Sequence, residues 1–277
     1  MPEGDTIFRA AAALQRALAG SVVTGFDTAL APLARVHDDT PITGRTIERC
    51  ESVGKHLLIT FSGELVLRTH MRMSGSWHLY RPGERWQRRP SAMRVRIDTA
   101  TWVAVAFDVP VAEFLRTRDL GRSRALSTLG PDLLSPAFDR DEALRRMAGA
   151  GPRPIAEALL DQRVVAGIGN VFKSEVLFLS GIHPDRLAST LTPGDFARIL
   201  NVAVPLMRAN TGAAASSGIV TYRGLRRTTR SASGEENFWV YSRGGKPCRK
   251  CGTPIASAKR GIDARTTYWC PTCQPLP

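Results

Sequence analysis

Four cysteines near the C-terminal end of the 277-residue chain form two Cys-x-x-Cys pairs: Cys248 with Cys251 and Cys270 with Cys273. Thiolates in two such pairs match a closed tetrahedral zinc site. Two disulfides are the alternative, which a cytoplasmic location would disfavour. Because four protein ligands leave no position for a catalytic water, the spacing predicts one structural zinc ion.

The segment "AGIGN", residues 166–170, has the composition of a turn that binds phosphate. Gly167 and Gly169 permit close approach of the backbone, and a helix that begins here directs free N–H groups outward. The Asn170 side chain can donate one more hydrogen bond to a phosphate. Close packing of two helices would explain the same glycines, so the turn alone leaves both interpretations open.

The chain begins "MPEGDT". Pro2 suits the first turn of a helix because its missing N–H would have no intrahelical partner there. Glu3 is favoured at the same place by the helix dipole. Taken alone, both residues indicate a helix start and no chemistry.

Arginines gather in "YRPGERWQRRPSAMRVR", residues 80–96, where Tyr80 and Trp86 interleave with six of them. Guanidinium groups suit bidentate contacts to phosphate. A solvated loop is the simpler interpretation of this cluster.

The whole chain is basic, with 38 Lys and Arg against 25 Asp and Glu and a formal net charge of +13. Such an excess is typical of nucleic-acid binders, although a cationic protein of a membrane surface would share it. No stretch approaches the roughly 20 apolar residues of a membrane span, and the N-terminus lacks the layout of a signal peptide. We therefore expect a cytoplasmic protein.

The elements that must position these residues fall into two kinds. The first helix should present Ile7, Ala11, Leu14 and Leu18 on one face, with Asp5 or Thr6 as its cap. Short apolar runs with turn residues between them then predict a β-sandwich. These runs are "HLLITF", "ELVLRTH", "GSWHLY", "RVRI" and "TWVAVAF".

Helical patterns dominate the second half, in "IAEALLDQRVV", "VFKSEVLFLSG" and "LTPGDFARILNVAVPLMRAN". We expect an α+β protein with three parts. They are a β-sandwich catalytic domain with flanking helices over residues 1–128, a linker and helix-two-turn-helix domain over 129–240, and a zinc-finger β-hairpin over 241–277. Residues 211–218 and 229–237 are predicted as loops.

Several motifs, in this order along the whole chain, resemble those of the formamidopyrimidine-DNA glycosylase/endonuclease VIII family of base-excision repair enzymes. They are "MPEGDT", "SVGKHLLI", "THMRMSGSW", "LGPDLL", "DQRVVAGIGNVFKSEVLF" and "PCRKCGTPI…ARTTYWCPTCQ". The resemblance implies a monomeric DNA glycosylase and abasic-site lyase that acts on oxidised bases or abasic sites in double-stranded DNA. "MPEGDT" favours the endonuclease VIII branch, and hence oxidised pyrimidines, with oxidised purines as the alternative.

For the N-terminus the resemblance implies covalent catalysis. Once Met1 is removed, the secondary amine of Pro2 attacks C1′ of the damaged nucleotide and forms an iminium. Glu3 moves protons to the sugar oxygen or the departing base. Lys55 is implied as the proton donor of β-elimination, and Arg265 as the residue for δ-elimination and for gripping the phosphate of the lesion.

The resemblance also implies residues that contact DNA. His70 and Asn170 correspond to phosphate contacts, and Met73 in "HMRMSG" to the residue that fills the space of the extruded base, with Arg72 beside it. Arg122 in "RDLGRSRAL" is expected at the opposite strand. By itself, His70 would be interpreted as a structural histidine.

Two departures leave the preferred lesion and opposite base open. The well-known endonuclease VIII pattern has Gln-Leu-Tyr where this chain has "RMS" at 72–74, and the Arg-Arg-Phe-Gly wedge of the other branch is missing. A non-catalytic DNA-binding zinc protein on the same fold is the competing hypothesis, with a ribosome-associated zinc ribbon as a third. Neither would need Pro2, Glu3 and Lys55 together.

Overall fold

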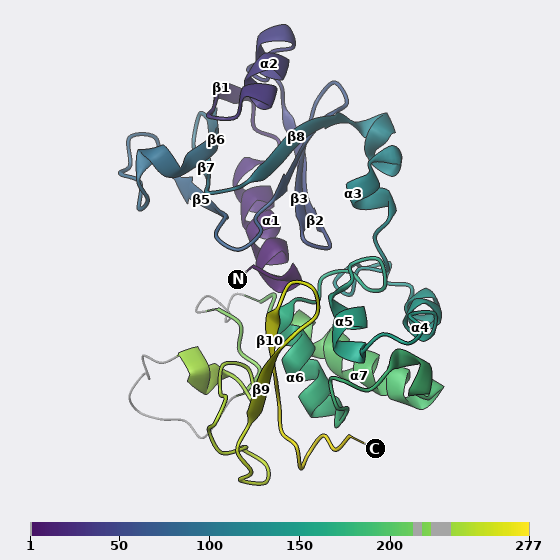
Figure 1. Ribbon diagram of the computed structural model, residues 1–277. Coiled ribbons are helices and arrows are strands. Elements are labelled where there is room, and N and C mark those ends of the chain that lie inside the picture. The colour runs from purple at the N-terminus through teal and green to yellow at the C-terminus, as the bar shows by residue number, and fades with distance from the viewer. Residues whose placement is uncertain (1, 213–217, 223–233, 277) are drawn as a thin grey trace. The chain divides into compact units, whose positions relative to one another are not determined.

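The computed structural model describes residues 2–212, 218–222 and 234–276. The chain divides into two compact units, residues 1–128 and 129–277 (Figure 1). Met1 and most of the two segments predicted as loops, 211–218 and 229–237, lie outside the described residues. Among the residues described, no helix is long and apolar enough to cross a membrane.

The first unit begins with helix α1 (Gly4–Leu18). The predicted apolar face is buried: Ile7, Ala11, Leu14 and Leu18 are at most 2% exposed. The helix starts earlier than predicted, because its N-cap is Glu3 rather than Asp5 or Thr6. The Glu3 carbonyl accepts from the N–H groups of Thr6 and Ile7, which draws Asp5 into the first turn.

Two antiparallel four-stranded sheets form the rest of the first unit, as a β-sandwich. One sheet has the order β1 (Val23–Thr28), β6 (Met93–Thr99), β7 (Val103–Phe107), β5 (Ser76–Tyr80). The other has the order β2 (Ile47–Val53), β3 (His56–Phe61), β4 (Leu65–His70), β8 (Val111–Arg116). Alternate residues of both sheets share one apolar core with α1, among them Ile59, Leu67 and Ile97. The remaining elements are α2 (Ala31–Asp39), η1 (Pro90–Ala92), η2 (Thr117–Arg122) and α3 (Arg124–Ser127).

Helices build the first part of the second unit. They are α4 (Arg140–Ala148), α5 (Ile155–Leu160), α6 (Asn170–Ser180), η3 (Ala188–Thr190), α7 (Pro193–Ala209) and η5 (Gly234–Asn237). Helix α6 packs against both α5 and α7. A capping box between Thr192 and Asp195 starts α7. Gly181 is the C-cap of α6 and takes a left-handed conformation with φ of 67°.

A two-stranded antiparallel hairpin, β9 (Ala256–Arg260) and β10 (Arg265–Trp269), completes the second unit. Its second strand packs against α6. Phe178 of α6 shares a small core with Val240, Ile255 and two of the four paired cysteines. The predicted fold class, a β-sandwich followed by helices and a cysteine-bearing β-hairpin, is confirmed.

Candidate active site

The N-terminal residues and Lys55 are delivered by neighbouring elements of the first unit. The N–H of Gly20, just after α1, donates to the Ile47 carbonyl at the start of β2. At the midpoint of β2, the N–H of Cys50 donates to the side-chain oxygen of Gln15 in α1 at 2.6 Å. Strand β2 therefore runs back along α1 toward the helix start. The turn that follows β2 and carries Lys55 is thus directed to the end of α1 where Pro2 and Glu3 lie.

Glu3 is fully buried, although most glutamates at a helix start are solvated. One residue of the same turn was not foreseen from the sequence. Asp5 is also fully buried, with Arg9 Nη2 at 3.4 Å from its carboxylate. Burial raises the pKa of Asp5 to about 6, and the nearby Glu3 charge adds to this, while Arg9 opposes it. Two acidic side chains thus share a poorly hydrated site beside Pro2.

His70 is the last residue of strand β4 and lies near the turn that carries Lys55. Its Nδ1 accepts a hydrogen bond from the Arg72 N–H at 3.1 Å, so a neutral ring carries its proton on Nε2. Burial, together with the charges of Lys55 and Arg72, lowers the pKa of His70 to about 4. At neutral pH the ring is an uncharged donor, which suits a phosphate contact.

Behind His70 lies a polar network that was not foreseen from the sequence. His56 pairs with His70 across the strands, and their rings meet edge to face at 4.9 Å. Arg68 Nη1 lies 2.9 Å from His56 Nδ1, and Arg68 Nε donates to Glu113 at 2.7 Å. Burial, His70 and Arg68 lower the pKa of His56 to about 3. The alternation of Arg68 and His70 along one strand is the signal that places both on one face.

The loop between β4 and β5 presents Met73, whose surface is 68% exposed. Arg72, beside it, is exposed and takes a left-handed conformation with φ of 47°. A Cβ at Gly75 would lie 2.6 Å from the Met71 carbonyl oxygen, so the tight loop requires glycine there. An exposed, flexible apolar side chain on a sharp loop has the form of a wedge between bases. Arg122 lies exposed at the end of η2.

In the second unit, Asn170 is the first residue of α6 and ties that helix to the hairpin. Its Nδ2 donates to the Thr266 carbonyl of β10 at 3.0 Å, and its Oδ1 accepts from Lys173 Nζ at 2.7 Å. Lys173 Nζ also donates to Thr267 Oγ1 at 2.7 Å. Sequence reasoning missed Lys173, although its place one turn after Asn170 puts the two on one helix face. Asn170 thereby joins the start of α6 to strand β10.

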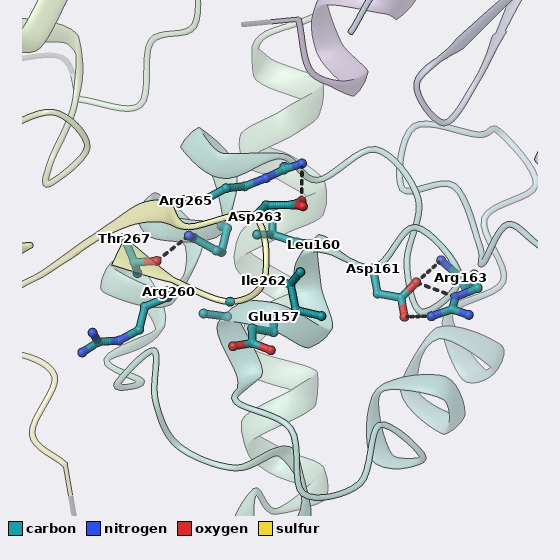
Figure 2. A pocket seen from close by; sticks show the side chains of 12 residues that line it. Glu157, Leu160, Asp161, Arg163, Arg260, Ile262, Asp263, Arg265 and Thr267 are labelled. Atoms are coloured by element: carbon teal, nitrogen blue, oxygen red, sulfur yellow. Dashed lines mark hydrogen bonds and ion pairs between the residues drawn. The ribbon is translucent and has the colours of Figure 1, made fainter. Parts of the chain in front are cut away.

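Arg265 begins β10 at the rim of a cavity of about 360 Å³ in the second unit (Figure 2). Its Nη2 lies 3.0 Å from Asp263, whose side chain is 69% exposed. An exposed ion pair of this kind is worth little, so a phosphate can replace Asp263. Arg260 points away from Arg265 in Figure 2 and is held at 2.8 Å by Asp185. Arg265 is therefore the arginine of this hairpin that is suited to bind an anion at the rim.

The four paired cysteines have the geometry of a metal site. Their sulfur atoms all lie within 4.8 Å of one another. Two of the separations are 3.9 Å, Cys248 to Cys273, and 3.4 Å, Cys251 to Cys270. Sulfurs bound to one tetrahedral zinc at about 2.3 Å lie at comparable separations. Backbone N–H groups of Lys250 and Cys273 donate to the Cys248 and Cys270 sulfurs. The residues fit the predicted structural zinc ion.

Comparison with known proteins covers nearly the whole chain. Family models match in chain order: the formamidopyrimidine-DNA glycosylase N-terminal domain over residues 1–122, the formamidopyrimidine-DNA glycosylase H2TH domain over 129–221, and the zinc finger found in FPG and IleRS over 245–276. A "Probable endonuclease 8 2" of Streptomyces coelicolor is 42% identical over 280 residues, which cover 100% of this chain and 95% of the relative.

A second relative, "DNA-(apurinic or apyrimidinic site) lyase Nei2" of Mycolicibacterium smegmatis, is 36% identical over 275 residues, which cover 99% of both chains. A solved structure of Lactococcus lactis formamidopyrimidine-DNA glycosylase bound to DNA with an abasic site has the same fold. Its TM-score is 0.81 at 21% identity, and the match covers 99% of this chain and 100% of that one. The chain belongs to the formamidopyrimidine-DNA glycosylase/endonuclease VIII family, on its endonuclease VIII-like branch.

Proposed function

We propose that this protein is a DNA glycosylase and abasic-site lyase of base-excision repair, with the Pro2 nitrogen as its nucleophile. The observation that carries the proposal is the convergence of the α1 start and the Lys55 turn at one end of the first unit. Family membership supports it, because the similar relatives bear the names of endonucleases and of an abasic-site lyase. A buried carboxylate beside a secondary amine suits proton transfer in catalysis, which DNA binding alone does not require.

The reaction begins with attack of the neutral Pro2 amine on C1′ of the damaged nucleotide. The bond from C1′ to the base breaks, the sugar ring opens, and an iminium forms between Pro2 and C1′. Glu3 donates a proton to the ring oxygen or to the departing base. The start of α1 disfavours a positive charge on Pro2, and so favours the neutral amine that attacks.

The iminium withdraws electrons from C2′, which loses a proton. The electron pair forms the C2′–C3′ double bond, and the 3′ phosphate leaves. The C2′ proton passes to water, and Lys55 donates a proton to the departing 3′ phosphate of this β-elimination. Arg265 binds the second phosphate for δ-elimination, and His70 and Asn170 each contact a backbone phosphate.

Met73 is proposed to fill the space left by the extruded base, with Arg72 beside it and Arg122 toward the opposite strand. Oxidised pyrimidines are the proposed substrates, in keeping with the endonuclease VIII-like relatives, and release of oxidised purines is the alternative outcome. We further propose a monomer that works on DNA in the cytoplasm. The zinc ion holds the hairpin that presents Arg265 and takes no part in the chemistry.

Borohydride trapping on a duplex with an abasic site tests this proposal. The protein with a free Pro2 should form a covalent adduct that mass spectrometry locates on residue 2. An uncleaved N-terminal extension converts Pro2 to an amide, whose lone pair is delocalised, and should abolish trapping while leaving DNA binding unchanged. Lys55→Ala should still form the adduct but complete β-elimination slowly, and Lys246→Ala, at an exposed lysine, serves as the control.

An adduct on Lys55, or trapping by the protein with the N-terminal extension, would show that the Pro2 nitrogen is not the nucleophile. If the protein binds DNA fully but forms no adduct and releases no base, the competing hypothesis of a non-catalytic DNA-binding protein would be correct.

A further inference from the structure

The arginine-rich loop between β5 and β6, residues 81–92, is not used by the proposed chemistry. It projects from the side of the first unit (Figure 1) and exposes residues 81–85 and 87–91 to solvent. We call residues 81, 85, 88 and 89, all arginines, the arginine stripe. A loop with this much like charge repels itself, so its fixed conformation needs a cause.

That cause is a second small core on the outer face of the β5–β7 sheet. Trp86 packs against Phe107 at 5.5 Å and against Tyr80 at 6.4 Å between ring centroids. The Tyr80 hydroxyl accepts from the Gln87 N–H at 3.1 Å, which pins the loop to the sheet. Trp86 is therefore committed to packing and cannot stack on a base. The loop is built to present its arginines.

The strand register fixes where these arginines lie. Arg81 stacks on Trp102, 3.7 Å from its ring centroid, at the end of the sheet where Tyr80 pairs with Val103. Arg88 binds Asp108 at 2.6 Å at the opposite end, where Ser76 pairs with Phe107. The stripe therefore runs the length of β5, about 17 Å for five residues.

The Arg88 end of the stripe lies next to the candidate active site of the same unit. Ser76 follows directly after the Met73 loop. Asp108 is three residues from Val111, which pairs with His70, so at most about 11 Å of chain separates them. The stripe thus starts at the edge of the surface that carries His70 and Met73 and leads away from it.

Two of the four guanidinium groups have no partner within the described part of the chain. In the described part of the chain, the side chains of Arg85 and Arg89 make no hydrogen bond or ion pair. The Glu84 carboxylate is taken by the backbone N–H of Arg81 at 2.8 Å. A row of four arginines of which only Arg88 is ion-paired among the described residues, with its aromatic ring turned inward, matches phosphates rather than bases.

We propose that the arginine stripe is a second DNA-binding surface, which holds the phosphates of the duplex flanking the lesion on one side. This inference rests on the proposed function, which supplies the DNA. Binding here is independent of sequence, and it lengthens the footprint on DNA by up to about five base pairs, since a duplex rises about 3.4 Å per pair.

The test compares two duplexes that carry the same abasic-site analogue, one of 11 base pairs with a central lesion and one of 31. The double variant Arg85→Gln/Arg89→Gln should lose little affinity for the short duplex, which reaches at most the Arg89 end of the stripe. On the long duplex its affinity should fall about tenfold or more at 0.1 M salt, and the slope of log K against log salt should shrink by about 1.8 for two phosphate contacts. The matched control, Arg16→Gln/Arg35→Gln, removes two exposed arginines of α1 and α2 and should leave both affinities unchanged.

Equal losses on both duplexes, or the same loss in the control, would reduce the effect to general charge and overturn the proposal. Unchanged affinity on the long duplex would also overturn it and assign the stripe to a partner other than DNA, such as an acidic protein. Cleavage of the short duplex with a true abasic site is measured in parallel. A parent protein that binds the long duplex through the stripe yet cleaves nothing would refute the proposed function and not this inference.

Discussion

The charged carboxylate of Asp5 lowers the free energy of unfolding at neutral pH, and a variant without this charge should be more stable. Its carboxylate is fully buried in the first turn of α1, with Arg9 at 3.4 Å. Folding raises its pKa from 3.8 to about 6. At 1.36 kcal/mol for each pKa unit, this difference corresponds to about 3 kcal/mol.

The sign follows from proton uptake. Between pH 3.8 and 6 the folded state binds more protons than the unfolded state, so stability falls as pH rises. The penalty is complete above pH 6 and absent below pH 3.8. Asp5→Asn should therefore raise the free energy of unfolding by up to about 3 kcal/mol at pH 7.5, with the gain shrinking progressively on acidification toward pH 4.

Urea denaturation followed by tryptophan fluorescence measures this effect. Replacing Trp239 and Trp269 with Phe leaves Trp77, Trp86 and Trp102, which all report on the first unit. Asp27→Asn, at an exposed aspartate of β1, is the matched control and should show the same dependence of stability on pH as the parent protein. A loss of stability in Asp5→Asn that is equal at pH 5 and pH 7.5 would refute the reasoning, because it would mean that the pair with Arg9 outweighs burial.

Three other predictions concern buried polar groups and the metal site. Folding lowers the pKa of His56 to about 3 and that of His70 to about 4. The unfolded chain therefore binds more protons below pH 6.5, and the free energy of unfolding falls on acidification, by about 4 kcal/mol in total at pH 5. His56→Gln should halve that loss in the same urea assay, and an unchanged pH profile would contradict it. The Glu175 carboxylate accepts from Thr221 and from the N–H groups of Trp239, Val240 and Tyr241. Glu175→Gln should cost about 2–5 kcal/mol, seen as early thermal unfolding of the second unit alone, whereas a wild-type melting curve would count against it. Cys251→Ser should release zinc to a chelator at least tenfold faster and weaken DNA binding without changing the unfolding of the first unit, and retention of zinc at the parent rate would show that three thiolates suffice.

Local sequence patterns predicted much of this structure. Short apolar runs such as "HLLITF" and "TWVAVAF", with turn residues between them, predicted strands of a sandwich, and both runs form strands that are almost entirely buried. Paired cysteines predicted the zinc site, since ligand spacing is itself local. The domain boundaries at 128 and 240 and the roles of the site residues stay predictions.

The features that escaped prediction depend on contacts between distant segments. Arg68 meets His56 only because the register of β3 and β4 aligns them, and Lys173 meets Thr267 only because α6 docks on β10. Neither register nor docking is encoded in a short run of residues. The start of α1 was misplaced for a different reason: Asp5 is a favourable cap by type, but burial of the first turn shifts the helix start to Gly4.

The four hydrogen bonds to Glu175 also set an order of assembly. The three backbone donors lie 64 to 66 residues after Glu175 in the chain. The Glu175 carboxylate can therefore form these hydrogen bonds only after the donors have been synthesised and have folded onto α6. The same carboxylate binds Thr221 on one side of residues 222–238 and Trp239 on the other. A single cut of the chain within that interval would thus leave both new ends attached to α6, and the nicked protein should remain one particle.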